Sequence, residues 1–300
     1  MISVLEKIEK RRGSKKTPWR LLLLAKDVLW SIRVLILKMK FYLDLRFSKG
    51  KFPDFIIIGA MKGGTTFLWK YLKKHPDIQM AENHFNKSNK KEVRFFDEEK
   101  NWMRGKRWYR RLFNDNNKLQ GEKSPEYLNT YKSHKRMYKT VPRVKLIILL
   151  RNPVTRAFSE WNMERISYER TLLDKKKIKR GPMIEKLSFE QTIKDNPKII
   201  ERGLYISQIN NLMRYYPRSQ ILILISEKMK KTPQESYDEV LDFLGLKRIK
   251  IKPKKEVNKA GYIKLMRKET ENLLYQFYEP YNQELFNFLG YEIKEWKNKK

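Results

Sequence analysis

The chain has 300 residues, of which 68 are Lys or Arg and 34 are Asp or Glu, so its formal net charge is +34. This length suits one large α/β domain, alone or with an appendage. The chain has no cysteine, which excludes disulfides, a thiolate nucleophile and cysteine metal sites. Its three histidines lack metal-ligand spacing, so we expect no metal. Anionic partners and a reducing compartment such as the cytoplasm fit this composition, although the charge could equally be a solvated surface.

The first 50 residues form a basic segment, with 13 Lys/Arg against four Asp/Glu. Between residues 19 and 47, Lys26, Arg33 and Lys40 recur every seven residues along an otherwise apolar stretch, which predicts an amphipathic helix with one basic stripe. No uncharged run approaches the roughly 18 residues of a membrane span. No small-residue cleavage site follows, as a secretory signal would require. We expect an N-terminal extension over 1–50 that lies on an anionic membrane, or packs on the domain or a partner.

The main domain is expected over residues 51–292, with a basic tail at 293–300. Short apolar, β-branched runs predict buried strands at 55–58, 144–150 and 221–225. Helical spacing of apolar residues predicts helices over 65–72, 108–113, 205–216, 233–244 and 265–289. A further helix is expected to begin at Asn152-Pro153, an N-cap followed by a first-turn proline. Alternating strands and helices predict a central parallel sheet flanked by helices.

Three other segments of the main domain are predicted to lack regular structure. Residues 78–100 and 168–186 read as loop-rich and charged, and residues 121–125 read as a turn.

The stretch GAMKGGTTFL, residues 59–68, directly follows the first predicted strand and opens a predicted helix. Glycines let the backbone approach an anion closely, and the helix N-terminus can face a phosphate. Gly59 and Gly64 keep the glycine spacing of the nucleotide-hydrolase loop G-x-x-x-x-G-K-[ST]. Thr65, however, stands where that loop has lysine, and Lys62 lies inside the loop instead. The stretch predicts a phosphate site of a different kind, or else a hydrolase loop whose lysine has drifted.

The strand predicted at 144–150 ends in Arg151-Asn152-Pro153. ATP and GTP enzymes of this kind need an aspartate on a second strand to help hold magnesium. A cation at that place binds an anion instead of a metal. We therefore expect a site for a nucleotide that carries an extra phosphate and no magnesium.

Four stretches, in this order and spacing, resemble the sulfotransferases that use 3′-phosphoadenosine 5′-phosphosulfate (PAPS): IIIGAMKGGTTFL, EVRFFD, GEKSPEYL and LIILLRNPVTRAFSEW. The resemblance runs from about Phe52 to Tyr291 and is nearest to the heparan-sulfate-type and related bacterial carbohydrate enzymes. It implies a P-loop NTPase-like sulfotransferase fold. It also implies in-line transfer of a sulfuryl group from PAPS to a hydroxyl or amine of a glycan, without a covalent enzyme intermediate.

The resemblance assigns one group of residues to the phosphosulfate end of the donor. The family's 5′-phosphosulfate loop is matched by Lys62, Gly63, Gly64, Thr65 and Thr66. A lysine ahead of the glycines can reach the bridging oxygen between phosphate and sulfate, where negative charge grows as the bond breaks.

A second group is assigned to the nucleotide end. Arg151 and Ser159 match the family's ligands of the 3′-phosphate, with a surface ion pair as the alternative for Arg151. Tyr205 resembles a residue near the nucleotide, but its place on an apolar helix face equally predicts a core residue. A basic, glycine-containing loop near the cofactor is matched by Lys259, Gly261 and Tyr262.

The resemblance also assigns the catalytic groups. Glu92 matches the general base of the heparan-sulfate enzymes, since a sugar hydroxyl needs somewhere to send its proton. The alternative is a solvated glutamate in a charged run. Lys123 matches a lysine near the transferring sulfuryl group, or else is a solvated turn lysine. His84 could act as base in place of Glu92, as histidine does in other sulfotransferase branches, but the surrounding AENHF lacks their pattern.

Two other classes of protein remain as alternatives. A P-loop kinase or NTPase needs magnesium, and no predicted strand ends in a convincing metal-binding aspartate. A basic nucleic-acid-binding protein explains the charge but leaves the ordered motifs unexplained. We therefore favour a sulfotransferase with a glycan acceptor, a membrane surface as a further partner through residues 19–47, and no nucleic acid. Acceptor recognition is expected on loops such as 79–91 and 165–186.

Overall fold

The structure is a computed structural model of the chain, and it describes residues 50–82, 91–173, 188–252 and 266–298. These residues belong to one compact unit that begins at Gly50. The predicted N-terminal extension, the alternative base His84 and the predicted cofactor loop with Lys259, Gly261 and Tyr262 lie outside the described residues. The domain bounds and these three assignments therefore stay predictions.

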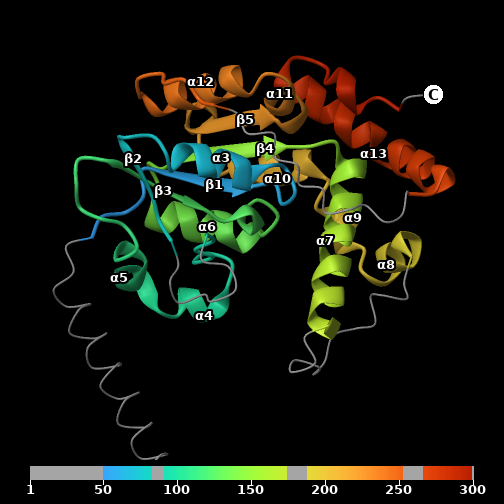
Figure 1. The fold of residues 1–300 in the computed structure, drawn as a ribbon, viewed down its shortest axis with the longest axis horizontal. Coiled ribbons are helices and arrows are strands. Elements are labelled where there is room, and N and C mark those ends of the chain that lie inside the picture. The colour runs from blue at the N-terminus through green and yellow to red at the C-terminus, as the bar shows by residue number, and fades with distance from the viewer. Residues whose placement is uncertain (1–49, 83–90, 174–187, 253–265, 299–300) are drawn as a thin grey trace, which may run out of the picture. The chain divides into compact units, whose positions relative to one another are not determined.

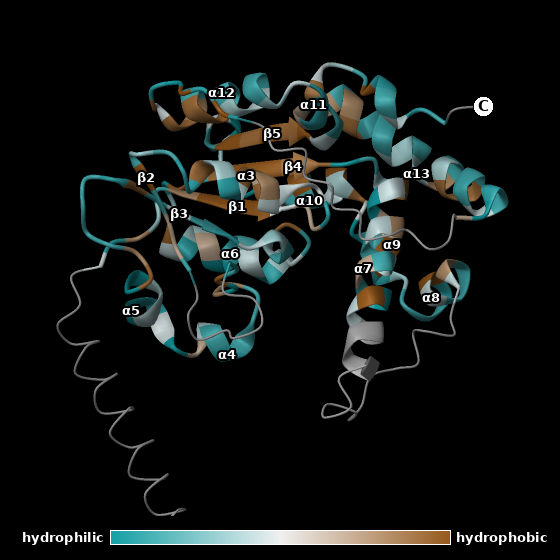
Figure 2. Cartoon of the chain, viewed as in Figure 1, coloured by the Kyte–Doolittle hydropathy of each residue, from teal (hydrophilic) through white to brown (hydrophobic). Residues whose placement is uncertain are grey.

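Five parallel strands form the central sheet in the order β2-β3-β1-β4-β5 (Figure 1). They are β1 (Phe55–Gly59), β2 (Ile78–Met80), β3 (Leu119–Lys123), β4 (Lys145–Leu150) and β5 (Ile221–Ile225). A parallel sheet covered on both faces needs apolar strands, and β1, β4 and β5 are of this kind (Figure 2). The predicted α/β fold with a parallel sheet is confirmed.

Two strands were not predicted from the sequence. β2 lies at the start of the segment predicted to be loop-rich, and β3 covers Gly121-Glu122-Lys123, which were predicted to be a turn. The prediction of a turn was wrong because β3 is largely polar, yet it is buried. Its polar side chains find partners from elsewhere in the chain: Lys123 Nζ, for example, donates to Glu92 Oε1 at 2.8 Å. A hydrophobic pattern cannot reveal such a strand.

The described helices are α3 (Thr65–Leu72), α4 (Glu99–Trp102), α5 (Gly105–Arg110), α6 (Tyr131–Thr140), α7 (Pro153–Leu173), α8 (Phe189–Asp195), α9 (Lys198–Glu201), α10 (Tyr205–Met213), α11 (Ser226–Lys231), α12 (Pro233–Leu244) and α13 (Lys268–Leu289). Short 3₁₀ turns are η1 (Pro125–Tyr127), η3 (Arg218–Gln220) and η4 (Lys294–Trp296). α5 begins three residues earlier than predicted, and α7 continues into the segment predicted as a loop from residue 168. α3, α10, α12 and α13 match their predictions within three residues.

Helices cover both faces of the sheet (Figure 1). α3 and α12 pack on one face, where Leu68 and Leu241 join Leu149 of β4 in one apolar cluster. α6 lies on the opposite face. A second apolar cluster joins α7 to α8, α9 and α13 through Trp161, Ile199 and Tyr278, among others. Because this cluster anchors the N-terminal part of α7, from Val154 to Trp161, the first turn of α7 is held at the end of β4.

The predicted N-cap of α7 is confirmed. Asn152 Oδ1 accepts hydrogen bonds from the backbone N–H groups of Val154, at 3.0 Å, and Thr155, at 3.3 Å. Pro153 then occupies the first helical position, where its missing N–H costs nothing. The chain therefore turns from strand to helix directly after Arg151.

Candidate active site

The carboxyl ends of β1, β3 and β4 lie side by side at one edge of the parallel sheet. The chain leaves these ends at the loop 59–64, at Lys123 and at Arg151. Ligands of open α/β sheets bind outside the carboxyl ends of the strands. The topology thus gathers three of the sequence motifs at the edge where a ligand is expected.

The loop after β1 has a backbone that only glycine permits at two positions. A Cβ atom on Gly63 would lie 2.2 Å from the carbonyl oxygen of Leu149, so any side chain there would clash with β4. Gly64 has φ +98°, in the left-handed region that favours glycine. Lys62 also has positive φ, at +65°, which is uncommon for a residue with a side chain and is found more often at functional sites.

The loop leads into the N-terminus of α3. No side chain caps this terminus, and its first turn has no acidic residue. Thr65 is buried and Thr66 is half-buried there. The backbone N–H groups and the helix dipole together favour a negatively charged group at this position. The local structure thus fits the phosphate site that the sequence predicts.

Lys123, at the end of β3, joins two other parts of the chain. Its ammonium nitrogen lies 2.8 Å from Glu92 Oε1 and 3.4 Å from Thr66 Oγ1, and 2% of its side chain is exposed. Burial lowers the pKa of Lys123, and the charge of Glu92 and the hydrogen bond to it oppose this shift. The structure therefore brings together Glu92, Lys123 and the first turn of α3. It does not agree with a solvated turn lysine.

Arg151, at the end of β4, connects the glycine-rich loop after β1 with α7. Its Nη1 donates to the carbonyl oxygen of Lys62 at 3.3 Å, and its Nε donates to Thr155 Oγ1 at 3.1 Å. Thr155 and Ser159 are four residues apart, on one face of α7. Ser159 is buried on that face. Arg151 and Ser159 are thereby placed at the same end of α7, beside the loop that contains Lys62.

Tyr205 contributes to the same edge from α10. It is 1% exposed, and its hydroxyl donates to the backbone carbonyl of Arg151 at 2.8 Å. Its ring lies 5.8 Å from that of Trp296. These contacts give Tyr205 a structural role in holding the end of β4, as the core alternative from the sequence expects. A role at the nucleotide stays a prediction.

Thr155 was not singled out from the sequence. Its position four residues after Arg151 and four before Ser159 is the signal that could have identified it. Glu122 was also passed over, although it lies inside the quoted stretch GEKSPEYL.

A buried ion-pair network joins α7 to the segments that follow β3 and α9. Glu160 accepts from Arg156 at 2.5 Å and from Arg202, whose guanidinium also lies 3.4 Å from Glu126 Oε2. Arg156 and Glu160 are fully buried. Breaking a buried pair of this kind costs far more than breaking an exposed one, because it leaves one charge uncompensated. The network holds α7 against α9 and against the η1 turn that follows β3.

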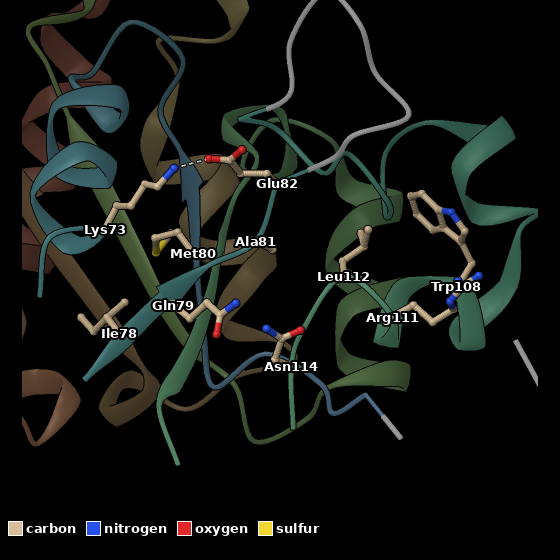
Figure 3. A pocket seen from close by; sticks show the side chains of 10 residues that line it. All are labelled: Lys73, Ile78, Gln79, Met80, Ala81, Glu82, Trp108, Arg111, Leu112 and Asn114. Atoms are coloured by element: carbon tan, nitrogen blue, oxygen red, sulfur yellow. Dashed lines mark hydrogen bonds and ion pairs between the residues drawn. The ribbon is translucent and has the colours of Figure 1, made fainter. Parts of the chain in front are cut away.

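A pocket of about 590 Å³ lies at the outer edge of the sheet, along β2 (Figure 3). This volume is in the range of small-molecule sites. Its walls come from α3, β2 and the segment in and after α5: Lys73, Ile78, Gln79, Met80, Ala81, Glu82, Trp108, Arg111, Leu112 and Asn114. Lys73 and Glu82 form an ion pair across it. None of the residues assigned to the donor or to catalysis lines this pocket.

Over residues 50–82, 91–173, 188–252 and 266–298, no helix is both long and apolar enough to cross a membrane. In the same part of the chain, no cluster of three or more metal-ligating side chains was found.

The sheet topology and the glycine-rich loop between β1 and α3 define a P-loop-like fold with basic side chains at its ligand-binding edge. The comparisons with known proteins narrow this class. The family described as "Sulfotransferase domain" matches residues 52–276. The chain belongs to this family of enzymes, and the resemblance seen in the sequence is confirmed.

Individual relatives agree with the family. The chain is 33% identical over 204 residues to heparan sulfate glucosamine 3-O-sulfotransferase 6 of Mus musculus, a match that covers 67% of this chain and 55% of that one. It is 25% identical to the membrane-associated sulfotransferase kil1 of Dictyostelium discoideum, over 82% of this chain and 67% of that one. The chain thus spans about half the length of the heparan sulfate relative.

A solved structure confirms the fold. The sulfotransferase from Alicyclobacillus acidocaldarius superposes with a TM-score of 0.65 at 26% identity, over 83% of this chain and all of the other. Sulfotransferase STF9 from Mycobacterium avium has a TM-score of 0.52 at 11% identity, and at that identity it speaks for the fold alone.

Proposed function

We propose that the protein transfers the sulfuryl group of PAPS to a hydroxyl, or an amine, of a glycan, with Glu92 as general base. The observation that carries this proposal is the position of Lys123, whose ammonium nitrogen contacts both the Glu92 carboxylate and Thr66 in the first turn of α3. One side chain, that of Lys123, thereby connects the proposed proton acceptor with the proposed anion-binding loop. A transferase that moves a sulfuryl group from an anionic donor to an acceptor hydroxyl needs both.

The residues at this edge fit the charge of PAPS. Lys62, Lys123 and Arg151 bring three cations to the carboxyl ends of β1, β3 and β4. The uncapped N-terminus of α3 adds the N–H groups of a helix end. We assign the 5′-phosphosulfate to Lys62 and the loop through Thr66, and the 3′-phosphate to Arg151 and Ser159. Arg151 suits a phosphate because a guanidinium can bind two of its oxygens at once.

When bound, PAPS supplies an activated sulfuryl group, which leaves a phosphate oxygen and joins the acceptor oxygen or nitrogen. Glu92 takes the acceptor proton, so the carboxylate becomes a carboxylic acid as the new bond forms. Lys62 places its positive charge at the loop, where the departing phosphate gains negative charge. Lys123 orients Glu92 through their ion pair and can stabilise the sulfuryl oxygens. Lys123 must stay protonated for this role, and its pair with Glu92 favours the protonated form.

The acceptor class is proposed from the relatives and from the pocket along β2. The names of the mouse and human relatives state action on heparan sulfate glucosamine. The pocket offers the amides of Gln79 and Asn114 and the guanidinium of Arg111, groups that suit hydroxyls and acidic substituents of a sugar. Ala81 lines the pocket, and its N–H donates to the carbonyl oxygen of Gly121 in β3 at 2.7 Å. The pocket therefore adjoins the strand that ends at Lys123. We propose that a part of the glycan that does not react binds here.

We propose a cytoplasmic enzyme that reaches an anionic membrane through residues 19–47. The basic stripe in the sequence of this segment supports the proposal, as does the membrane association stated in the name of the Dictyostelium relative. The segment lies outside the described residues, so a direct binding test is required.

The test of the proposed chemistry compares two variants that should fail in different ways. Glu92→Gln keeps the shape but cannot accept a proton, so turnover of PAPS with heparan sulfate oligosaccharides should fall roughly 10²- to 10⁴-fold, the usual contribution of a general base. Its affinity for adenosine 3′,5′-bisphosphate should stay unchanged. Lys62→Ala should lower turnover and weaken PAPS binding together.

The exposed residues Glu284 and Lys135 provide matched controls, as Glu284→Gln and Lys135→Ala. Near-normal turnover of Glu92→Gln, with loss in His84→Ala, would transfer the role of base to His84. Tighter binding of ATP with magnesium than of the bisphosphate would replace the sulfotransferase with a kinase or NTPase.

A further inference from the structure

Glu122 is a fully buried carboxyl in the middle of the candidate site region, one residue before Lys123. Successive side chains of a strand point to opposite faces, so Glu122 points away from the Glu92–Lys123 pair. The described hydrogen bonds of its carboxyl go to hydroxyl groups and not to the loop 59–64. A buried carboxyl needs hydrogen-bond partners, and those of Glu122 must come from the face opposite to Lys123.

Three hydroxyl groups surround the Glu122 carboxyl. Ser124 Oγ and Tyr127 Oη donate to its Oε2, at 3.2 and 3.4 Å, and Tyr109 Oη donates to its Oε1. All three hydroxyl-bearing residues are fully buried. Glu122 is therefore the common acceptor of a closed polar cluster made by β3, η1 and α5.

Two of these hydroxyls continue the network to the segment that follows Glu92. The N–H of Arg94 donates to Ser124 Oγ at 2.9 Å, and the N–H of Phe95 donates to Tyr127 Oη at 2.7 Å. The N–H of Phe96 also reaches Tyr127 Oη, at 3.3 Å. Both hydroxyls thus accept from the backbone of residues 94–96 and donate to the same carboxyl oxygen. The Tyr109 hydroxyl makes no described contact with that segment.

The segment 94–96 needs such support because of its conformation. Arg94 has φ +53°, in the left-handed region that a residue with a side chain rarely adopts. Conformations of this kind persist where the surroundings hold them. Asn101 Nδ2 holds the segment from the other side by donating to the carbonyl of Arg94 at 3.1 Å. This backbone turn lies two residues after Glu92.

We propose that Glu122 is a positioning residue for Glu92: through the hydroxyls of Ser124 and Tyr127 it fixes the 94–96 backbone and so aims the base at the acceptor. This inference rests on the proposed role of Glu92. Lys123 holds the Glu92 carboxylate from one face of β3. Glu122, on the other face, holds the backbone of residues 94–96 through the two hydroxyls. One strand thereby positions the base from two directions.

The network works in both charge states of Glu122. Burial raises the pKa of the carboxyl to about 8, against the hydroxyl hydrogen bonds that lower it. When Glu122 is protonated on Oε1, the proton can point to the oxygen of Tyr109, and Oε2 still accepts from Ser124 and Tyr127. Glutamine offers the same pattern, with its carbonyl oxygen in place of Oε2 and its NH₂ group facing Tyr109. Methionine has a similar length and can accept neither hydroxyl well.

The first test compares two tyrosines that donate to the same carboxyl. Tyr127→Phe and Tyr109→Phe each remove one buried hydroxyl and keep the ring, but only Tyr127 contacts the amides of Phe95 and Phe96. In Tyr127→Phe, hydrogen exchange of the 94–96 amides should become about tenfold faster. Its kcat should fall roughly tenfold, with unchanged binding of adenosine 3′,5′-bisphosphate. Tyr109→Phe should show neither change.

The second test exchanges the carboxyl itself. Glu122→Gln should keep most of the turnover that Glu122→Met loses, and exchange at residues 94–96 should follow the same order. Equal exchange at 94–96 in both tyrosine variants overturns the inference. The inference is also overturned if exchange at 94–96 is faster in Tyr127→Phe but its kcat does not fall, while Glu92→Gln is inactive. Failure of the proposed function is read separately, from an active Glu92→Gln enzyme, and leaves the exchange result unaffected.

Discussion

The ammonium nitrogen of Lys123 lies 2.8 Å from Glu92 Oε1, in a position where 2% of the lysine side chain is exposed. Burial lowers the pKa of Lys123, and the negative charge of Glu92 and its hydrogen bond are what oppose that shift. The charge state of Lys123 therefore depends on its pair with Glu92.

The first prediction follows from this dependence. In Glu92→Gln the opposing charge is gone, so the pKa of Lys123 should fall below its value in the unaltered protein. A ¹³Cε NMR titration measures it, with Lys123→Arg to assign the resonance. Glu82→Gln, which removes the partner of the more exposed Lys73, serves as control and should leave Lys123 unchanged. An identical Lys123 midpoint in Glu92→Gln and the unaltered protein would contradict the ion pair.

The second prediction concerns the nucleotide. Arg151→Ala should weaken binding of adenosine 3′,5′-bisphosphate in EDTA by roughly 10- to 100-fold, the contribution of a charged hydrogen bond. Thr155→Val should weaken it less, because it removes only the hydroxyl that accepts from Arg151 Nε. Calorimetry measures both. Arg248→Ala, which alters an exposed arginine paired with Asp242, is the control. AMP lacks the 3′-phosphate, so Arg151→Ala should weaken its binding less than that of the bisphosphate. If the substitution weakens the binding of both ligands by the same factor, Arg151 does not contact the 3′-phosphate.

The third prediction concerns stability in acid. Burial lowers the pKa of His134 from 6.5 to about 4. Its Nε2 lies 3.0 Å from the carbonyl of Leu128 and its Nδ1 lies 2.7 Å from Asn211 Nδ2, so the neutral Nε2–H form satisfies both. Between these pKa values the unfolded chain binds the proton and the folded protein does not. The stabilisation is therefore fully present above pH 6.5 and is lost as the pH falls towards 4, by up to about 3 kcal/mol.

Urea unfolding at a series of pH values measures this effect. His134→Gln removes the titrating group, so the difference in unfolding free energy between it and the unaltered protein should shrink as the pH falls from 6.5. A difference that stays constant from pH 7 to pH 4.5 would show that His134 is not kept neutral by the fold.

The fourth prediction concerns the pocket along β2. Arg111→Ala should raise the KM for a heparan sulfate oligosaccharide about 3- to 10-fold, because one polar contact to the acceptor is lost. Its kcat and its binding of the bisphosphate should not change, since Arg111 lines no part of the donor site. Arg107→Ala, in α5, which ends one residue before Arg111, lies outside the pocket lining and is the matched control. An equal KM in both variants would place the acceptor elsewhere.

The fifth prediction concerns the basic N-terminal segment. The full chain should co-sediment with vesicles that contain phosphatidylserine, and a variant without residues 1–48 should not, because the basic stripe supplies the attraction. Replacing Lys26, Arg33 and Lys40 by Gln should leave an intermediate fraction of the protein bound to the vesicles. Added salt should lower that fraction. Equal sedimentation of the full and truncated chains would rule out a membrane role for this segment.

The sequence by itself determined those parts of the protein in which neighbouring residues set the structure. The apolar runs of β1, β4 and β5, the glycines at 63 and 64, and the cap at Asn152 each act within a few residues of chain. For this reason the glycine-rich turn from β1 to α3, the place of Arg151 after β4 and the fold class could all be predicted. The order and spacing of the motifs are by themselves enough to indicate the family.

Tertiary structure alone decided the rest. β3 is a buried strand although it reads Leu-Gln-Gly-Glu-Lys, and Lys123 meets a partner 31 residues away in sequence. Glu122 likewise depends on Tyr109, 13 residues distant, and on hydroxyls that hold residues 94–96. A polar side chain can be buried only where partners satisfy it, and those partners come from other segments. No local pattern contains them, so the turn predicted at 121–125 was wrong and the positioning of Glu92 became visible only in the folded chain.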